Sequence, residues 1–75
     1  MAYYGKRDWL IKLRKSKGLS QDMTAALSDV SQTYYSKIEN GFVDPSPEIV
    51  DRICATLGIT SDEFYGKDDL RISGD

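Results

Sequence analysis

The sequence predicts an all-α protein built from five short helices. Glycine stands directly behind stretches in which apolar residues recur with helical spacing, at positions 18, 41, 58 and 66. Glycine is common in the left-handed position just past a helix end, so these positions predict where helices stop. Alternation of apolar and polar residues never extends far enough to predict a β-strand.

The first three helices are predicted over residues 8–17, 21–28 and 32–40. Ser20 and Ser31 precede the second and third helices, where a serine hydroxyl can accept a backbone N–H that has no partner inside the helix. Tyr35 and Ile38 form the inward stripe of the third helix. Only a short turn separates the second helix from the third, which forces a sharp angle between them.

The last two helices have equally clear starts. Ser46 can cap the fourth helix, and Pro47 takes its first position, where a missing N–H does no harm. The inward stripe of this helix has helical spacing and consists of Val50, Ile53, Cys54 and Leu57. The segment Thr60–Glu63 has the pattern of a capping box, and Phe64 reaches the core before the fifth helix ends at Gly66.

Length and composition predict one ordinary globular domain. We divide the 75 residues into an N-terminal arm of residues 1–7, a helical domain of residues 8–66 and a frayed polar tail of residues 67–75. No run approaches the roughly 20 apolar residues that span a membrane, so we expect no membrane contact.

Residue types needed for metal binding or catalysis are scarce. The chain has one cysteine, Cys54, and no histidine, so it lacks a disulfide framework and the soft ligands of a structural zinc site. Cys54 falls on an inward helical stripe, and no carboxylate pair or glycine-rich phosphate loop stands out. We expect a reduced cytoplasmic protein that is not an enzyme and has no metal, no cofactor and no small-molecule substrate.

The two halves of the chain carry opposite charge. Residues 1–40 have seven Lys or Arg against four Asp or Glu, and residues 41–75 have three against eight, so the halves carry +3 and −5. This asymmetry fits a basic face that binds a polyanion and an acidic face turned away from it. It equally fits two solvated faces without a partner.

Four segments together resemble one family, and they are Gly18–Gln21, Ser31–Gly41, Pro45–Pro47 and Leu57–Ile59. In this order and spacing they are similar to the phage repressor and Cro type of helix-turn-helix transcriptional regulator, also called the XRE family. The resemblance runs from about Leu10 to Tyr65. It implies a five-helix repressor-like domain in which the third helix lies in the major groove of double-stranded DNA and the second crosses above it.

The resemblance also implies roles for individual residues. Base edges are read at the positions held by Gln32, Thr33, Ser36 and Lys37. Gln32, Thr33 and Lys37 also stand opposite the inward stripe of the third helix, and their side chains suit base contacts. Contacts to the DNA backbone are implied or expected at Gln21, Ser31, Tyr34, Asn40 and Lys17, although Lys17 equally suits a solvated face. Arg14 and Glu39 match a partly buried salt bridge between the first and third helices.

The second helix departs from the family pattern. The family usually has large apolar residues where Thr24 and Ser28 stand, and glycine in the turn where Asp29 stands. Met23 and Leu27 are apolar at neighbouring positions, so the helix is rotated, longer or loosely packed. Asp29 can adopt the left-handed conformation more easily than most residues.

The family resemblance further implies a homodimer on a palindromic operator, with repression as the commoner outcome. The expected dimer contacts are Phe42, Val43, Pro45, Leu57 and Ile59, which flank the two-fold contact in relatives. Trp9 lies where the family is commonly polar and packs either within its own chain or against a second subunit. The alternative function is a protein-binding module, an antitoxin or adaptor that uses the acidic half of the same scaffold.

Overall fold

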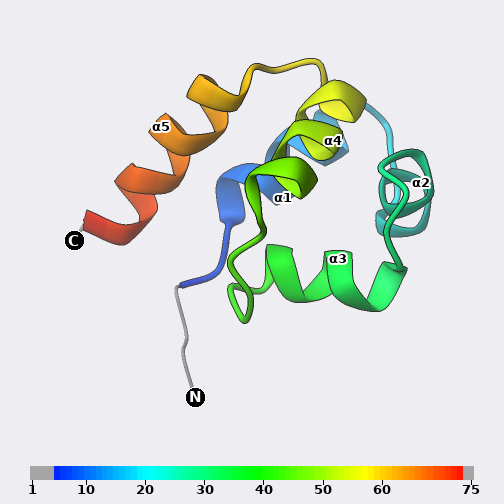
Figure 1. Ribbon diagram of the computed structural model, residues 1–75, viewed down its shortest axis with the longest axis horizontal. Coiled ribbons are helices and arrows are strands. Elements are labelled where there is room, and N and C mark those ends of the chain that lie inside the picture. Colours follow the sequence, from blue (N-terminus) through cyan, green and yellow to red (C-terminus); the bar gives the residue numbers. More distant parts are fainter. Residues whose placement is uncertain (1–4, 74–75) are drawn as a thin grey trace.

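The computed structural model of the chain describes residues 5–73, with side chains up to residue 70. This part of the chain forms five helices and no strand, which confirms the all-α fold (Figure 1). The helices are α1 (Asp8–Ser16), α2 (Gln21–Leu27), α3 (Gln32–Glu39), α4 (Pro47–Leu57) and α5 (Ser61–Ser73). Residues 1–4 of the expected arm and 74–75 of the expected tail lie outside the described residues.

Each predicted cap at a helix start is present. The hydroxyls of Ser20, Ser31 and Ser46 accept the backbone N–H three residues further on, at the starts of α2, α3 and α4. At α5, the Glu63 carboxylate accepts the Thr60 N–H at 2.9 Å, and the Thr60 hydroxyl accepts the Glu63 N–H at 3.1 Å. The hydrogen bond from the Thr60 N–H to the carboxylate lowers the pKa of Glu63, as expected for a carboxylate that accepts an N–H group.

The turn after α3 requires glycine on two counts. Gly41 has φ +82°, and a Cβ at this position would collide with the carbonyl oxygen of Gly5. Only glycine combines this conformation with such a close approach of backbone to backbone. The segment before α1 therefore lies directly against the end of α3.

The predicted end of the fifth helix at Gly66 is wrong. Helix α5 continues through Gly66 to Ser73, and Gly66 does not have positive φ. The physical reason lies in Asp68, which is buried and holds the second half of α5 against the rest of the molecule. This tertiary contact outweighs the roughly 1 kcal/mol by which an interior glycine disfavours a helix. Residues 67–73 are thus part of a helix and not a frayed tail.

The core fills the space between the helices in two connected clusters. The larger contains Leu10, Ala25, Tyr35, Ile38, Ile53 and Leu57. The smaller contains Val50, Cys54 and Phe64. Trp9 packs against both clusters and meets the Phe64 ring edge-on, with ring centroids 5.0 Å apart. Trp9 therefore packs within its own chain, which is one of the two arrangements expected from the sequence.

Helix α2 turns its polar residues inward. Thr24 and Ser28 are buried, whereas Met23 and Leu27 are exposed, so the helix is neither rotated nor extended. The Thr24 hydroxyl donates to the Ser20 carbonyl at 2.9 Å, and the Ser28 and Thr56 hydroxyls are hydrogen-bonded at 2.9 Å between α2 and α4. Buried polar groups cost little when each has a partner, which explains how these residues replace apolar ones.

Arg7 is the most heavily bonded side chain in the described part of the chain and is fully buried. Its Nε and Nη2 donate to the two Asp68 carboxylate oxygens at 2.9 and 3.1 Å. Its Nη1 donates to the carbonyls of Ile38 and Val43 at 2.7 and 3.0 Å, and Nη2 also donates to Asp44 at 3.1 Å. Arg7 was expected in a peripheral arm, but it joins α3, the loop after α3 and α5.

Candidate nucleic-acid interface

Helix α3 has one buried face and one polar exposed face. Tyr35, Ile38 and Glu39 are fully buried. The four residues expected to read bases lie on the other side, where Ser36 is half-buried and the exposed residues are Gln32, Thr33 and Lys37. The helical period of 3.6 residues places them together, so the structure brings all four onto one surface.

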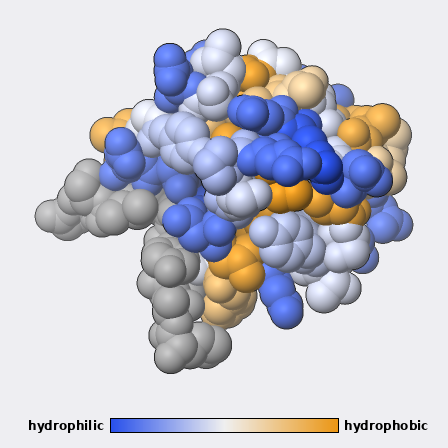
Figure 2. Space-filling view, viewed as in Figure 1, coloured by the Kyte–Doolittle hydropathy of each residue, from blue (hydrophilic) through white to orange (hydrophobic). Residues whose placement is uncertain are grey.

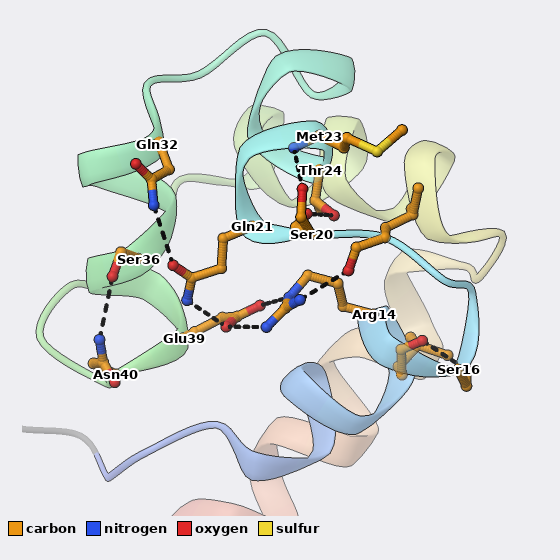
Figure 3. A network of polar contacts seen from close by, with 12 residues as sticks. Arg14, Ser16, Ser20, Gln21, Met23, Thr24, Gln32, Ser36, Glu39 and Asn40 are labelled. Atoms are coloured by element: carbon orange, nitrogen blue, oxygen red, sulfur yellow. Dashed lines mark hydrogen bonds and ion pairs between the residues drawn. The ribbon is translucent and has the colours of Figure 1, made fainter.

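A chain of hydrogen bonds links this surface to the interior (Figure 3). Arg14 Nε lies 2.6 Å from Glu39 Oε2, and both side chains are buried. Gln21 Nε2 donates to Glu39 Oε1 at 2.9 Å, and Gln32 Nε2 donates to Gln21 Oε1 at 3.4 Å. The expected salt bridge between α1 and α3 is therefore formed. It continues through the first residue of α2 to the first residue of α3.

The charge of Glu39 acts on both of its buried neighbours. Its hydrogen bond to Arg14 raises the pKa of the guanidinium, which stays charged. Burial, followed by the nearby Glu39 carboxylate, raises the pKa of the Tyr35 hydroxyl, which stays neutral. The inner side of α3 thus carries one compensated ion pair and one neutral phenol.

The turn between α2 and α3 fixes the angle at which α3 is presented. Asp29 has φ +58°, the left-handed conformation that a small polar residue tolerates better than most. The Val30 N–H reaches back to the Ala25 carbonyl at 3.0 Å. Arg52 on α4 donates to the Asp29 carbonyl at 3.4 Å. Ala25 is buried, so its small side chain lets the two helices cross closely.

The residues expected at the DNA backbone lie at or near the ends of α1, α2 and α3. Gln21 and Ser31 stand at the starts of α2 and α3, and Tyr34 is half-buried against the core. Asn40 follows α3 and donates to the Ser36 hydroxyl at 3.3 Å. Lys17 is exposed after the end of α1, and its ammonium lies 4.0 Å from the place that a Cβ on Gly58 would take.

Two of the expected dimer contacts are inside the domain. Leu57 is 1% exposed and belongs to the larger core cluster, and Pro45 is buried too. Val43 and Ile59 are half-buried and pack on the core clusters, which leaves Phe42 as the one exposed member of the set. The expectation that Leu57 is a dimer contact is wrong, because the inward stripe of α4 extends to Leu57, the last residue of this helix.

Arg7 was missed by sequence analysis although it holds the end of α3. Besides its contact with the Ile38 carbonyl, its backbone N–H donates to the Glu39 carbonyl at 2.8 Å. A positive side chain at a helix C-terminus is favourable to the helix dipole. Its carboxylate partner Asp68 is 61 positions away, so no local pattern could reveal it.

Within residues 5–73, no group of three or more metal-ligating side chains could hold a metal ion. In the same residues, no helix is long and apolar enough to cross a membrane. The candidate site consists of the polar face of α3 and the crossing of α2 over α3. This arrangement defines a helix-turn-helix protein that can present α3 to DNA.

Comparison with known proteins agrees with this class. The helix-turn-helix family model matches residues 10–64. The control protein C.MunI of Mycoplasma sp is 49% identical over 57 residues, which are 75% of this chain and 77% of that protein. The chain belongs to the helix-turn-helix family of DNA-binding transcriptional regulators.

Two solved structures share the fold. The clp gene regulator ClgR from Corynebacterium glutamicum has a TM-score of 0.77 at 26% identity, covering 88% of this chain and 86% of that chain. The restriction-modification controller protein C.AhdI from Aeromonas hydrophila has a TM-score of 0.71 at 33% identity, covering 80% and 88%. Both are named for a role in regulation or control.

Proposed function

We propose that this protein is a restriction-modification controller that represses transcription by occupying a palindromic operator as a homodimer. The observation that carries the proposal is the exposed polar face of α3, opposite Tyr35 and Ile38. The specific role is supported by the names of two relatives, C.MunI at 49% identity and C.AhdI at 33% identity. We propose no enzymatic activity for it, and it would act in the cytoplasm, where bacterial DNA lies.

In this proposal, three side chains on α3 read base edges directly. The Gln32 amide pairs with adenine, the Lys37 ammonium donates to guanine, and the Thr33 methyl packs on a thymine methyl. Ser36 lies between them on the same face and can accept or donate. Gln32 donates one amide N–H to Gln21 Oε1, which leaves its carbonyl oxygen and its other N–H for the base.

The DNA backbone is held around this reading face. Gln21 and Ser31 present the starts of two helices, whose N–H groups favour an anion. Tyr34 and Asn40 complete the set at the two ends of α3. Phosphate contacts of this kind set the register on the duplex without specifying sequence. Lys17, which is exposed after the end of α1, is a further candidate for a phosphate contact.

Selection from a randomised DNA pool, followed by titration at two salt concentrations, tests the proposal. We expect enrichment of a single inverted repeat and affinity that falls steeply as salt rises. Gln32→Ala and Lys37→Ala should each relax base preference at particular operator positions by about 1–3 kcal/mol. Lys12→Ala, which removes an exposed charge from α1, serves as the matched control and should leave base preference unchanged.

Two outcomes would contradict the assignment. Equal losses on every sequence from Gln32→Ala and Lys37→Ala would show that these residues do not read bases. Absence of any enriched sequence at low salt would refute DNA recognition and favour a protein-binding module. Footprinting on the DNA upstream of the chain's own coding sequence then tests the controller role, with protection of one inverted repeat as the expected result.

A further inference from the structure

The hydrogen-bond chain behind the polar face of α3 consists of four side chains from three helices. It runs from Arg14 on α1 through Glu39 and Gln21 to Gln32, the first residue of α3 (Figure 3). Its inner end is buried, whereas Gln32 is exposed. Figure 2 shows hydrophilic and weakly polar residues at its lower right, where Figure 1 places α3. The chain therefore connects a fixed group in the interior with a side chain that can meet a ligand.

Glu39 is the fixed end of this chain. Its carboxylate oxygens accept from Arg14 Nε at 2.6 Å and from Arg14 Nη2 at 3.3 Å. Neither side chain can turn away without leaving the other as an unpaired buried charge, which is strongly unfavourable. A carboxylate paired with a guanidinium has acceptors and no proton to donate. Every further hydrogen bond to Glu39 must therefore come from a donor.

This requirement determines how the Gln21 amide is oriented. An amide has a donating NH2 end and an accepting carbonyl end, and rotation by half a turn exchanges the two. Facing the carboxylate, Gln21 presents its Nε2, which lies 2.9 Å from Glu39 Oε1. The Gln21 carbonyl oxygen consequently points away from Glu39 and is left for another donor.

The orientation of Gln21 in turn determines that of Gln32. The Gln21 carbonyl oxygen accepts from Gln32 Nε2 at 3.4 Å, so Gln32 also directs a donor toward the interior. In the reverse orientation of Gln32, two carbonyl oxygens would face each other without a proton between them. The carbonyl oxygen and the second N–H of Gln32 are therefore left on the exposed side, in an order that originates at Glu39.

This order bears on which base the exposed edge of Gln32 can recognise. Adenine combines an acceptor with a donor on its major-groove edge, whereas guanine presents two acceptors there. A glutamine that rotates freely presents its donor and acceptor in either order, and it loses more side-chain entropy when a base fixes it. An amide that is already held in one orientation is therefore more selective for adenine than a free one.

We infer that Glu39 and Gln21 are positioning residues for base recognition, because the buried carboxylate sets, through the Gln21 amide, the order of donor and acceptor that Gln32 presents. This inference rests on the proposed function for the contact between Gln32 and a base. It gives Gln21 a role in specificity besides the phosphate contact expected for it. The two roles are compatible, because the amide of Gln21 has a second N–H that can donate to a phosphate oxygen.

Gln21→Met tests the inference, because it removes the amide and keeps an unbranched side chain. The variant is titrated with four duplexes that carry the sequence selected by the wild-type chain and differ only at the position where Gln32→Ala loses its preference. We expect the preference for adenine at this position to fall about fivefold or more. Preference at the position read by Lys37, which is not a member of the hydrogen-bond chain, should stay unchanged. One common loss of affinity for all four duplexes would indicate a phosphate contact alone and would overturn the inference.

Tyr34→Phe is the matched control. Tyr34 is also expected at the DNA backbone, and its hydroxyl lies outside the hydrogen-bond chain. Its removal should change the affinity for all four duplexes by a single factor. In a Gln32→Ala background, Gln21→Met should cause no further change in base preference, since a positioning residue acts only through the residue that it holds. A further change there would overturn the inference.

Glu39→Gln tests the inner end of the chain. The new amide can still accept from Arg14, but it can either donate to Gln21 or accept from it, so the orientation of Gln21 is no longer determined. We expect the same selective loss of adenine preference as in Gln21→Met. Circular dichroism establishes that the variants fold, and unchanged preference in a folded Glu39→Gln would overturn the role of Glu39. The Gln21→Met variants, which keep the buried ion pair, decide the test if Glu39→Gln does not fold.

The side-chain amide of Gln32 provides a readout that needs no DNA. Gln21 and Gln32 are the two glutamines of the chain, so Gln32 gives the one remaining glutamine signal in Gln21→Met. We expect the NMR order parameter of its NH2 group to fall in this variant, and an unchanged order parameter would overturn the inference. A wild-type chain that enriches no DNA sequence refutes the proposed function and the inference with it. Enrichment of one sequence, together with a uniform loss in Gln21→Met, refutes the inference alone.

Discussion

Two buried arginines carry much of the internal organisation of this small domain. Arg14 pairs with Glu39, and Arg7 uses all five of its N–H donors on carbonyl and carboxylate oxygens. A buried guanidinium is tolerated only when its donors are matched, since desolvation of the charge costs several kcal/mol. The stability of the domain therefore depends on the acidic partner of each arginine.

At this scale we predict that Glu39→Ala lowers the free energy of unfolding by about 3–5 kcal/mol. The substitution leaves the Arg14 side chain, which is 9% exposed, without its carboxylate and also removes the acceptor of Gln21. Such a loss is a large share of the roughly 5–15 kcal/mol typical of a folded domain. Urea denaturation at neutral pH measures it.

Glu48→Ala is the matched control for this prediction. Glu48 also pairs with an arginine at 2.6 Å, but the side chains of Glu48 and Arg52 are 74% and 38% exposed. Solvent-exposed pairs contribute at most about 1 kcal/mol, so we expect little change. Equal losses in the free energy of unfolding would show that the buried pair contributes no more to stability than the exposed pair.

At the scale of elements, two glycines show why a residue type alone does not define a helix end. Gly58 follows α4 with φ +74°, whereas Gly66 lies inside α5. Gly58 stands between Leu57 and Ile59, and Gly66 stands between Tyr65 and Lys67, but each follows a stretch with helical spacing. The difference is set by the contact of Asp68 with Arg7, which keeps α5 helical beyond Gly66.

We predict that Gly66→Ala raises the free energy of unfolding by about 0.5–1 kcal/mol, because alanine favours a helix interior. Apart from the adjacent residues and the backbone of α5 itself, nothing lies within 4 Å of a Cβ added there, so the methyl group meets no obstacle. Gly58→Ala has comparable space but requires positive φ, and it should be destabilising. Thermal unfolding compares the two, and a loss from Gly66→Ala would indicate that α5 ends there after all.

Local signals account for most of the elements that were predicted. Caps at Ser20, Ser31, Ser46 and Thr60 are readable because their hydrogen bonds span three residues. The inward face of α2 was not predicted, because the partner of Ser28 is the Thr56 hydroxyl on another helix. The polar face of α3 could be predicted from the helical spacing of its residues. Its connection to Gln21 and Glu39 could not, because only the fold brings these side chains together.

At the scale of the whole molecule, the ends of the chain stabilise its centre. Arg7 and Asp68 lie on either side of residues 10–64, which the family model matches, and they bind each other. Through the carbonyls of Ile38 and Val43, Arg7 also holds the end of α3 and the loop after it. The segments outside the family match therefore support the helix proposed to read DNA.

Our last prediction is that Arg7→Met lowers the free energy of unfolding by about 3–5 kcal/mol, since it leaves the buried Asp68 carboxyl group without its guanidinium partner. Arg7→Met combined with Asp68→Leu should recover part of this loss, because removing both charges removes the desolvation cost as well. Hydrogen exchange measures where the loss occurs. We expect faster exchange in α5 beyond Gly66 and at the end of α3, with α2 unchanged. Uniform acceleration in all five helices would instead show that Arg7 contributes only to global stability and does not couple α5 to α3.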